Sequence, residues 1–363
     1  MHILITGGAG FLGSRLARTL LKKSTLNHQT ITRLTLMDQF PIPLDLQADP
    51  RVECKTGTLL ELEPWLKKTP LDGVFHLASA VSGECEADFD LGLNSNLKST
   101  MGLLEALRHQ QKPGKALTRL VFSSSIAVYG PDASVALPDT VSESTLTTPQ
   151  TSYGVHKLMC EHLIADYSRK GLIDARSVRL MTVCVRPGKP NGAASSFFSA
   201  IIREPLAGTA SVCPVDASVS HPVASPESAV QGLIRVFECS PEQLGGRIAV
   251  NMPALNVTVQ EMLDALTRVA GERVRRLVTF KEDPVISGIV ARWPKAVRAN
   301  RAASLGLQVE KTFDDIIHQY IHDAINDNID HNTSDKANKS ANPLALQGLN
   351  PSVLKTFLAK HTP

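Results

Sequence analysis

The segment from Ser152 to Lys157, Ser-Tyr-Gly-Val-His-Lys, places a phenol and an ammonium four residues apart. Residues at i and i+4 of a helix project from the same face, so the side chains of Tyr153 and Lys157 can lie together. An ammonium beside a phenol favours the ionised form, and a phenolate can act as a general base. The pair is therefore a candidate for proton transfer. An ordinary helix carrying a tyrosine and a solvated lysine gives the same pattern, so the interpretation depends on the rest of the chain.

A glycine-rich segment follows the short apolar run at residues 2–6 and reads Gly-Gly-Ala-Gly-Phe-Leu-Gly. Glycines permit a tight turn and let a pyrophosphate approach the backbone, and a following helix offers unpaired N–H groups to the phosphates. The spacing differs by one residue from Gly-x-Gly-x-x-Gly. We expect a dinucleotide to bind here, at Gly7, Gly10, Phe11, Leu12 and Gly13.

A second apolar run, residues 33–38, ends in Asp38. A carboxylate at the end of the second strand can accept hydrogen bonds from the adenosine ribose and repels a 2′-phosphate. This position favours NAD over NADP as the cofactor. A solvated aspartate closing a strand is the alternative.

Three serines, Ser123 to Ser125, close an apolar strand and should emerge at the carboxyl edge of a parallel sheet, where such folds bind ligands. Ser125 could hold a substrate hydroxyl there, although serines also end strands at simple turns. Asn96 is expected in a long helix between two strands, where it could support Lys157 through a water molecule. An exposed asparagine on that helix is the alternative interpretation.

The first 180 residues alternate strands with amphipathic helices, which predicts right-handed βαβ units. The expected fold class is α/β, a doubly wound parallel sheet (Rossmann) with a smaller C-terminal substrate-binding lobe. We expect an NAD-binding domain at residues 1–185, with 226–253 returning to it, a substrate lobe at 186–325 and a polar, mobile tail at 326–363. The expected strands lie near residues 2–6, 33–38, 51–55, 73–77, 119–123 and 175–183.

Composition narrows the class of partner. The 363 residues carry a formal net charge of +3 without a basic stripe, which argues against nucleic acid. No apolar run reaches membrane-spanning length, and the chain starts with a short strand in place of a signal peptide, so a cytoplasmic location is expected. The six cysteines show no Cys-x-x-Cys pair or zinc-like spacing, and no metal site is predicted.

Taken in order, these features resemble the extended short-chain dehydrogenase/reductases over about the first 190 residues. The resemblance implies that Tyr153 is the catalytic acid/base, that Lys157 promotes its ionisation and binds the nicotinamide ribose, and that Ser125 positions the reacting C–O group. It also implies a homodimer paired through the helix that carries Tyr153. The residues implied in cofactor binding, beyond those named above, are Leu77, Ala78 and Ser123.

Residues 185–191, 194–199 and 202–206 resemble the group of these enzymes that oxidises D-erythronate, a four-carbon sugar acid, at C2 with NAD. The resemblance implies that Arg186 and Asn191 contact the substrate, and a guanidinium suits a small carboxylate because it binds both oxygens. Two alternatives stay open. A nucleotide-sugar (UDP-hexose) epimerase uses the same Tyr/Lys/Ser set, and a non-catalytic dinucleotide-binding protein could keep the fold without the reaction.

Overall fold

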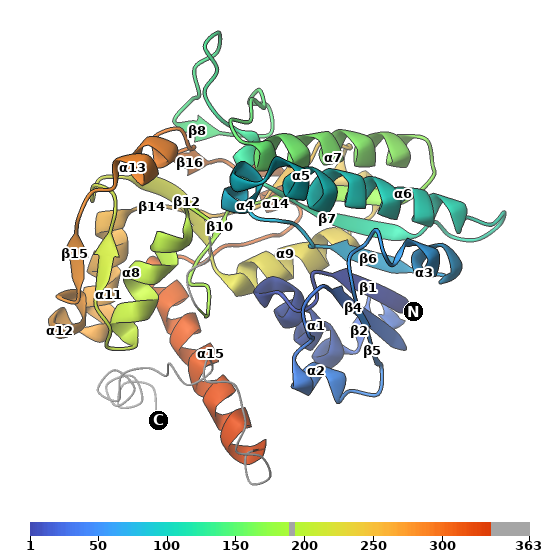
Figure 1. Ribbon diagram of the computed structural model, residues 1–363, viewed down its shortest axis with the longest axis horizontal. Helices are drawn as coiled ribbons and strands as arrows, with labels where there is room; N and C mark the ends of the chain where they lie inside the picture. Colours follow the sequence, from blue (N-terminus) through green and yellow to red (C-terminus); the bar gives the residue numbers. More distant parts are fainter. Residues whose placement is uncertain (189–192, 335–363) are drawn as a thin grey trace. The chain divides into compact units, whose positions relative to one another are not determined.

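The computed structural model describes residues 1–188 and 193–334 and divides into two compact units (Figure 1). The first unit comprises residues 1–181, 226–253 and 297–308. The second comprises the described residues within 182–225, 254–296 and 309–334. Both units are therefore discontinuous in sequence, and the segment 297–308 belongs to the first unit without any sequence pattern that predicts its return.

A seven-stranded sheet forms the centre of the first unit, in the order β13-β9-β7-β6-β1-β4-β5. Neighbouring strands pair in parallel throughout, from β1 to both β4 and β6 and outward to the two edges. The chain moves from β1 toward β5 and then returns to the other side of β1 at β6, which makes the gap between β1 and β6 the topological switch point. The strands are β1 (His2–Thr6), β4 (Arg33–Asp38), β5 (Val52–Thr56), β6 (Gly73–His76), β7 (Arg119–Ser125), β9 (Asp174–Leu180) and β13 (Val250–Asn251).

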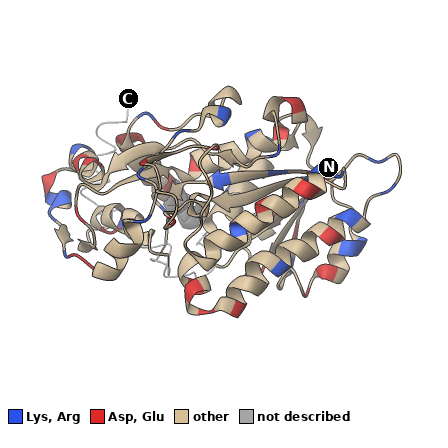
Figure 2. Ribbon diagram, turned by 90° about the horizontal axis from the view of Figure 1, so that it is seen from above, with Lys and Arg blue, Asp and Glu red and all other residues tan. Residues whose placement is uncertain are grey.

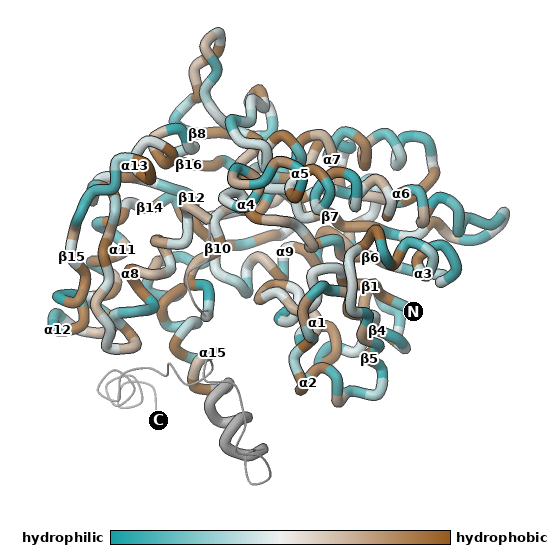
Figure 3. The backbone as a smooth tube through the Cα atoms, in the orientation of Figure 1, coloured by the Kyte–Doolittle hydropathy of each residue, from teal (hydrophilic) through white to brown (hydrophobic). Residues whose placement is uncertain are grey.

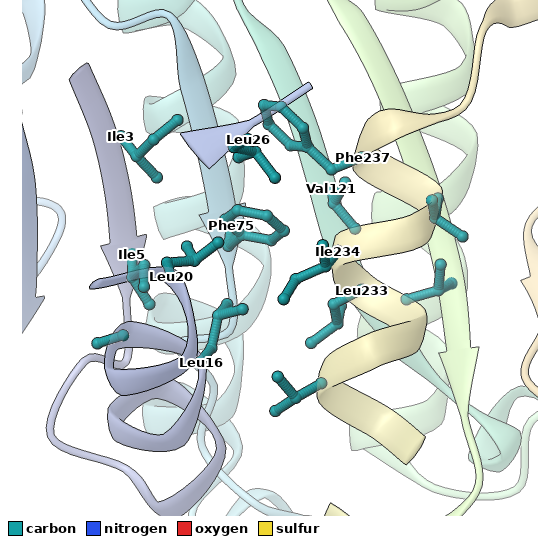
Figure 4. Close-up of a cluster of buried hydrophobic side chains, with 14 of the residues drawn as sticks. Ile3, Ile5, Leu16, Leu20, Leu26, Phe75, Val121, Leu233, Ile234 and Phe237 are labelled. Carbon is teal, nitrogen blue, oxygen red and sulfur yellow. The ribbon is translucent and has the colours of Figure 1, made fainter. Parts of the chain in front are cut away.

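Helices cover both faces of this sheet, as a parallel sheet requires. On one face, α1 and α9 pack Leu16, Leu20 and Leu233 against Ile5 and Phe75 of the strands (Figure 4). The other face is covered by α3, α6 and α7. The helices and short elements of the unit are α1 (Phe11–Lys23), β2 (Thr25–Leu26), β3 (Gln29–Thr30), α2 (Leu44–Gln47), α3 (Glu63–Lys68), α4 (Ser82–Ala87), α5 (Phe89–Gly92), η1 (Leu93–Lys98), α6 (Ser99–His109), η2 (Ile126–Val128), β8 (Thr140–Val141), α7 (Ser152–Arg169), α9 (Pro226–Glu238), α10 (Pro241–Leu244) and α14 (Asn300–Ser304).

The second unit has its own apolar core, built by α8, α11 and α15 against short strands. Its three-stranded sheet has the order β10-β12-β14, and β11 pairs with β15 in parallel. The elements are β10 (Thr182–Val183), α8 (Ser196–Leu206), β11 (Ser211–Cys213), β12 (Ser220–Ala224), β14 (Leu255–Thr258), α11 (Val259–Ala270), α12 (Glu272–Arg275), β15 (Val278–Phe280), α13 (Pro284–Val290) and α15 (Phe313–Ser334). One further strand, β16 (Ala296–Val297), lies at a sequence boundary between the units.

Three elements differ from the sequence-based expectation. The strand expected at 175–183 is interrupted at Met181, and its last residues form β10 in the sheet of the second unit. The helix around Asn96 contains a π-helical segment, η1. Helix α15 continues to Ser334 and so includes residues 326–334 of the predicted tail, whose mobility stays a prediction. The rest of that predicted tail, 335–363, lies outside the described residues.

Hydropathy follows the layers of the fold. The helices that flank the sheet alternate hydrophilic and hydrophobic stretches, as expected for elements with one buried face (Figure 3). Acidic and basic residues are interspersed along the helices seen in Figure 2. Within the described part of the chain, no helix is both long and apolar enough to cross a membrane.

Candidate active site

Helix α7 presents Tyr153 and Lys157 from its first turns. Thr151 caps the helix by accepting a hydrogen bond from the Gly154 backbone N–H at 3.1 Å. The Nζ of Lys157 lies 5.5 Å from the centre of the Tyr153 ring, so the i, i+4 pair does share one face. Because the cap fixes where the helix begins, it also fixes the height of both side chains along the sheet.

Lys157 is almost fully buried, and its ammonium donates to the backbone carbonyl of Ser123 at 2.8 Å. It also lies 4.8 Å from the centre of the Phe122 ring. Burial lowers the pKa of Lys157 from 10.5 to about 8, and the neighbouring Cys160, Cys85 and Glu161 oppose this shift. A cation is thus held beside the phenol of Tyr153 in a region that water hardly reaches.

Ser125 lies where β7 ends, and its Oγ accepts a hydrogen bond from the Ala127 backbone N–H at 3.1 Å. The hydroxyl therefore caps the short helix η2, and its proton remains to be donated to another oxygen. Helix α7 meets this turn closely, because a Cβ on Gly154 would stand 2.2 Å from the carbonyl oxygen of Ala127. The absence of a side chain at Gly154 thus lets the turn after Ser125 pack against the turn that carries Tyr153.

The side chain of Asn96 has a different set of partners from the expected one. Its Oδ1 accepts from the Ala80 N–H at 2.8 Å and from the Ser79 hydroxyl at 3.1 Å, and its Nδ2 donates to the Ala80 carbonyl at 3.2 Å. The side chain thus fastens the loop after β6 to η1. A water-mediated link from Asn96 to Lys157 stays a prediction.

The glycine-rich turn runs from β1 into α1 at the switch point of the sheet. Gly7 has φ +74°, a conformation that favours glycine, and a Cβ there would lie 2.9 Å from the Ala78 nitrogen. A Cβ on Gly13 would stand only 2.0 Å from the Gly7 carbonyl oxygen. The first backbone bond of the helix runs from Ser14 N–H to Gly10 at 2.8 Å, so the N–H groups of residues 11–13 lie ahead of that ladder, as at any helix start.

Asp38 ends β4 beside this turn. One carboxylate oxygen accepts from the Ala9 N–H at 2.9 Å and the other from the Phe40 N–H at 3.1 Å. The carboxylate therefore holds the glycine-rich turn in place, and its remaining lone pairs can accept hydrogen bonds from a ribose. A bare backbone turn, an unpaired helix N-terminus and a strand-end carboxylate are the features that a dinucleotide requires, so the residues present fit this group.

The ends of β6 and β7 line up next to β1. The Ala78 N–H donates to the Thr6 hydroxyl at 3.2 Å, as does the Leu77 N–H. The Ser123 hydroxyl donates to the carbonyl of His76 at 3.1 Å. These bonds place Leu77, Ala78 and Ser123 at one edge of the sheet with the glycine-rich turn.

His76 itself is fully buried between two threonines. Its ring nitrogens lie 2.7 Å from the Thr6 hydroxyl and 2.9 Å from the Thr100 hydroxyl. Burial, with a smaller effect of the nearby Lys157 charge, lowers the pKa of His76 to about 3, so the ring is neutral at physiological pH. A neutral ring tied to both neighbouring elements has a structural role at the strand end.

Of the two residues expected to contact the substrate, Arg186 and Asn191, the structure describes Arg186. Arg186 belongs to the second unit, where its Nε donates to the Val183 carbonyl at 2.9 Å and one terminal nitrogen donates to the Ser195 hydroxyl at 3.1 Å. Arg203 donates to the carbonyl of Arg186 at 2.8 Å. Asn191 lies outside the described residues. Substrate binding by Arg186 and Asn191 stays a prediction.

Glu161 lies one helical turn beyond Lys157 and is not among the residues predicted from the sequence to form the site. Its carboxylate accepts from Arg179 of β9 through two nitrogens, at 2.9 and 2.7 Å, and from the Ser124 hydroxyl. The signal that could have found it is the spacing, because residues 153, 157 and 161 continue one i, i+4 series along a single helix face.

Comparison with known proteins assigns the family. Residues 3–240 match the NAD dependent epimerase/dehydratase family. The chain belongs to this family. The resemblance to the extended short-chain dehydrogenase/reductases is thereby confirmed, together with NAD as the cofactor.

Two curated members of the family are similar over nearly their whole length. The D-erythronate dehydrogenase of Cupriavidus necator is 47% identical over 88% of this chain and 98% of its own length. The D-erythronate dehydrogenase of Haemophilus influenzae is 41% identical over 88% of this chain and 99% of its own.

Solved structures give the same fold. A nucleoside-diphosphate-sugar epimerase from Agrobacterium tumefaciens superposes with a TM-score of 0.83 at 40% identity, over 90% of this chain and 95% of that one. The L-threonine 3-dehydrogenase of Trypanosoma brucei has a TM-score of 0.76 at 24% identity, over 89% of this chain and 96% of its own, and shows likeness of fold alone. The expected doubly wound parallel sheet is confirmed.

Proposed function

We propose that this protein is an NAD-dependent dehydrogenase that oxidises the C2 hydroxyl of D-erythronate to the 2-oxo acid. The observation that carries the proposal is the near full-length likeness to two D-erythronate dehydrogenases, at 47% and 41% identity. The cluster of Tyr153, Lys157 and Ser125 at the carboxyl edge of the sheet supports it, because oxidation of a secondary alcohol needs a base and an oxygen-positioning donor.

The cofactor site is formed by the glycine-rich turn, Asp38 and the ends of β6 and β7. The phosphates would meet the N–H groups at the start of α1, and the adenosine ribose would donate to Asp38. Lys157 and Tyr153 would contact the nicotinamide ribose. When bound, NAD supplies the acceptor for the hydride that leaves C2.

The proton of the substrate hydroxyl is transferred to a residue of the chain. Tyr153, ionised beside the Lys157 ammonium, accepts the proton of the C2 hydroxyl as the C–H bond breaks and the C=O bond forms. The hydroxyl of Ser125 donates to the same substrate oxygen and stabilises its developing negative charge. The arrangement thus keeps the positive charge of Lys157 close to the group that must lose a proton.

Substrate selection is the part of the proposal that rests on the second unit. A four-carbon acid presents a carboxylate, and the planar guanidinium of Arg186 is the type of group that binds both oxygens of a carboxylate. Asn191 would add an amide for a hydroxyl. On this proposal, replacement of Arg186 raises KM for the acid more than it lowers kcat.

An epimerase is the second candidate, favoured by the likeness to the Agrobacterium tumefaciens epimerase at 40% identity. An epimerase returns the hydride to the same sugar, so it shows no net NADH release. The dehydrogenase is the better supported of the two, because two curated relatives that match this chain over nearly their whole length bear that name.

The experiment that tests the function follows NADH at 340 nm with NAD or NADP and a panel of four-carbon aldonates, other 2-hydroxy acids and UDP-sugars. We expect NAD-dependent oxidation of D-erythronate, lowered at least a thousandfold in Tyr153→Phe. Conversion of a UDP-sugar to its epimer without NADH would establish the second candidate instead. Unchanged turnover in Tyr153→Phe would remove the assigned base.

A homodimer is part of the same proposal. Helices α5, α6 and α7 expose apolar side chains on the first unit, namely Phe89, Leu91, Met101, Val155 and Met159. A second copy of the chain would cover them. Light scattering after gel filtration should give the mass of two chains, and Met159→Glu should give one chain, whereas the loop control Leu146→Glu should stay dimeric. A monomeric wild type would contradict this assignment.

A cytoplasmic location is also proposed. All six cysteines are unpaired, and five of them are buried, which suits a reducing compartment. Fractionation of cells that express the tagged protein should place it with cytoplasmic markers, and recovery in a secreted fraction would contradict the location.

A further inference from the structure

A buried ion pair lies directly behind the Tyr153/Lys157 pair, and the proposed reaction does not use it. Glu161 of α7 and Arg179 of β9 are 6% and 4% exposed and meet through two hydrogen bonds. Charged side chains are seldom buried this deeply unless a pairing holds them, and a buried pair is no evidence of stability in itself. Its place suggests another role.

Glu161 links the two elements that carry the candidate active-site residues, α7 and β7, and Arg179 ties it to the neighbouring strand β9. Arg179 pairs in register with Ser124, the residue between the two serines that face the site, and the Ser124 hydroxyl donates to Glu161. One residue earlier, the Ser123 carbonyl accepts from Lys157. Helix α7 is therefore fastened to the end of β7 by two successive bonds, one from Lys157 and one to Glu161.

The network continues past Arg179 to a buried tyrosine. Arg179 donates to the Tyr129 hydroxyl, which in turn donates to the Ser142 carbonyl at 2.9 Å or to Asn251 at 3.0 Å. Ser142 lies in the segment that leads to the start of α7. Glu161 is thus braced from β9 and from the segment before the helix, so its carboxylate has one fixed position.

That position is close enough to influence Lys157. Glu161 lies one turn further along the same helix face, and its negative charge favours the charged ammonium. The titratable groups that face Lys157 among the described residues are Tyr153, Cys160 and Glu161 of α7, Cys85 of α4 and His76 of β6. Burial keeps the two thiols protonated by raising their pKa, and it keeps His76 neutral, so Glu161 is the carboxylate of this group.

We propose that Glu161, held by Arg179, is a positioning residue of the active site. It sets the register of the Tyr153/Lys157 helix against the end of β7 and keeps the positive charge on Lys157 that the base requires. The inference deepens the proposed dehydrogenase function and rests on it.

The test is the pH dependence of kcat in Glu161→Gln, which removes the charge and keeps the shape. The alkaline limb, where Lys157 loses its proton, should move to lower pH by about 0.5 to 1 unit. Glu161→Asp, which keeps the charge, should hold the limb near its wild-type position. A limb that does not move in Glu161→Gln would overturn the proposal and leave the pair a structural one.

Asp174→Asn is the matched control. Asp174 accepts from Arg119 at 2.7 Å, across the same two strands but at their other end. This variant should lower the melting temperature without moving the limb. If Glu161→Gln does not fold, Glu161→Leu combined with Arg179→Met replaces the pair by apolar groups, and the limb should again lie lower than in the wild type.

A second readout does not depend on turnover. The proton affinity of Lys157 can be followed by comparing the free energy of unfolding with and without Lys157→Met across pH, in the wild-type and Glu161→Gln backgrounds. The titration should occur at lower pH in Glu161→Gln, and the same pH in both backgrounds would overturn the proposal. Failure of the wild type to oxidise D-erythronate would instead reject the substrate, while this titration would still decide the role of Glu161.

Discussion

At the scale of single residues, the candidate active site contains one buried ammonium, that of Lys157, whose burial costs free energy of folding. Lys157 is 3% exposed, and its hydrogen bond to the Ser123 carbonyl replaces several bonds to water. The lowered pKa of Lys157 records that cost, because a buried charge is less stable than a solvated one. On the proposed mechanism the charge is nonetheless useful there, since it lies beside the phenol of Tyr153 that would ionise.

Replacing Lys157 by methionine should therefore stabilise the protein at neutral pH while abolishing turnover. The pKa falls from 10.5 in the unfolded chain to about 8 in the fold, which corresponds to a cost of about 3 kcal/mol at pH 7. The variant also loses the hydrogen bond to the Ser123 carbonyl, which offsets part of this gain. The free energy of unfolding should therefore rise by about 1–2 kcal/mol. Urea unfolding without cofactor measures it.

The sign of the pH dependence follows from proton binding. Below about pH 8 both states hold the proton, and the full cost is present. Between pH 8 and 10.5 the unfolded chain binds more protons than the fold, so wild-type stability rises relative to Lys157→Met. The advantage of the variant should vanish toward pH 10. The exposed Lys112→Met should show no such trend, and a constant advantage of Lys157→Met at all pH values would contradict the burial argument.

At the scale of elements, we expect the backbone of the turn between β1 and α1 to bind the cofactor. A Cβ on Gly13 cannot be accommodated 2.0 Å from the Gly7 carbonyl oxygen without moving the turn. Gly13→Ala should therefore weaken NAD binding at least a hundredfold, measured by calorimetry. Gly102→Ala in helix α6 is the control, because its Cβ would meet nothing nearer than 3.8 Å, and it should gain about 0.5–1 kcal/mol. Unaltered NAD affinity in Gly13→Ala would show that the turn adapts.

The helices and strands of the first unit could be predicted from the sequence where the local pattern is strong. β1 and β4 begin and end at the expected residues, because each is a short apolar run bounded by turn residues or a carboxylate. The start of α7, next to its capping residue Thr151, could also be predicted from the sequence. The π-helical segment η1 was not, because the hydrogen-bond pattern inside a helix leaves no mark in the hydrophobic period.

Partners from distant segments explain what the sequence missed in the site. The Oγ of Ser125 caps η2, and the amide of Asn96 holds the loop at Ala80, which strand-end position and helix location do not reveal. Glu161 meets Arg179 across 18 residues, and a charged residue on an amphipathic helix is normally assigned to the solvent face. The partners of these side chains are set by tertiary contacts, which the local sequence pattern does not contain.

At the scale of the whole molecule, both units are assembled from separate stretches of chain. Residues 226–253 and 297–308 complete the unit that holds the cofactor residues, and residues between them belong to the other. The residues proposed to bind NAD therefore lie in one unit that has its own sheet and core. Substrate choice rests on the likeness to D-erythronate dehydrogenases over 88% of the chain, which includes the second unit.

The fate of the hydride at C2 tests the central claim most directly. D-erythronate carrying deuterium at C2 is incubated with the protein and NAD, and both products are analysed by mass spectrometry. The account predicts one deuterium in each NADH and none in an equal amount of 2-oxo acid. Deuterium retained in the organic product, with no labelled NADH released, would contradict a dehydrogenase and indicate an internal return of the hydride.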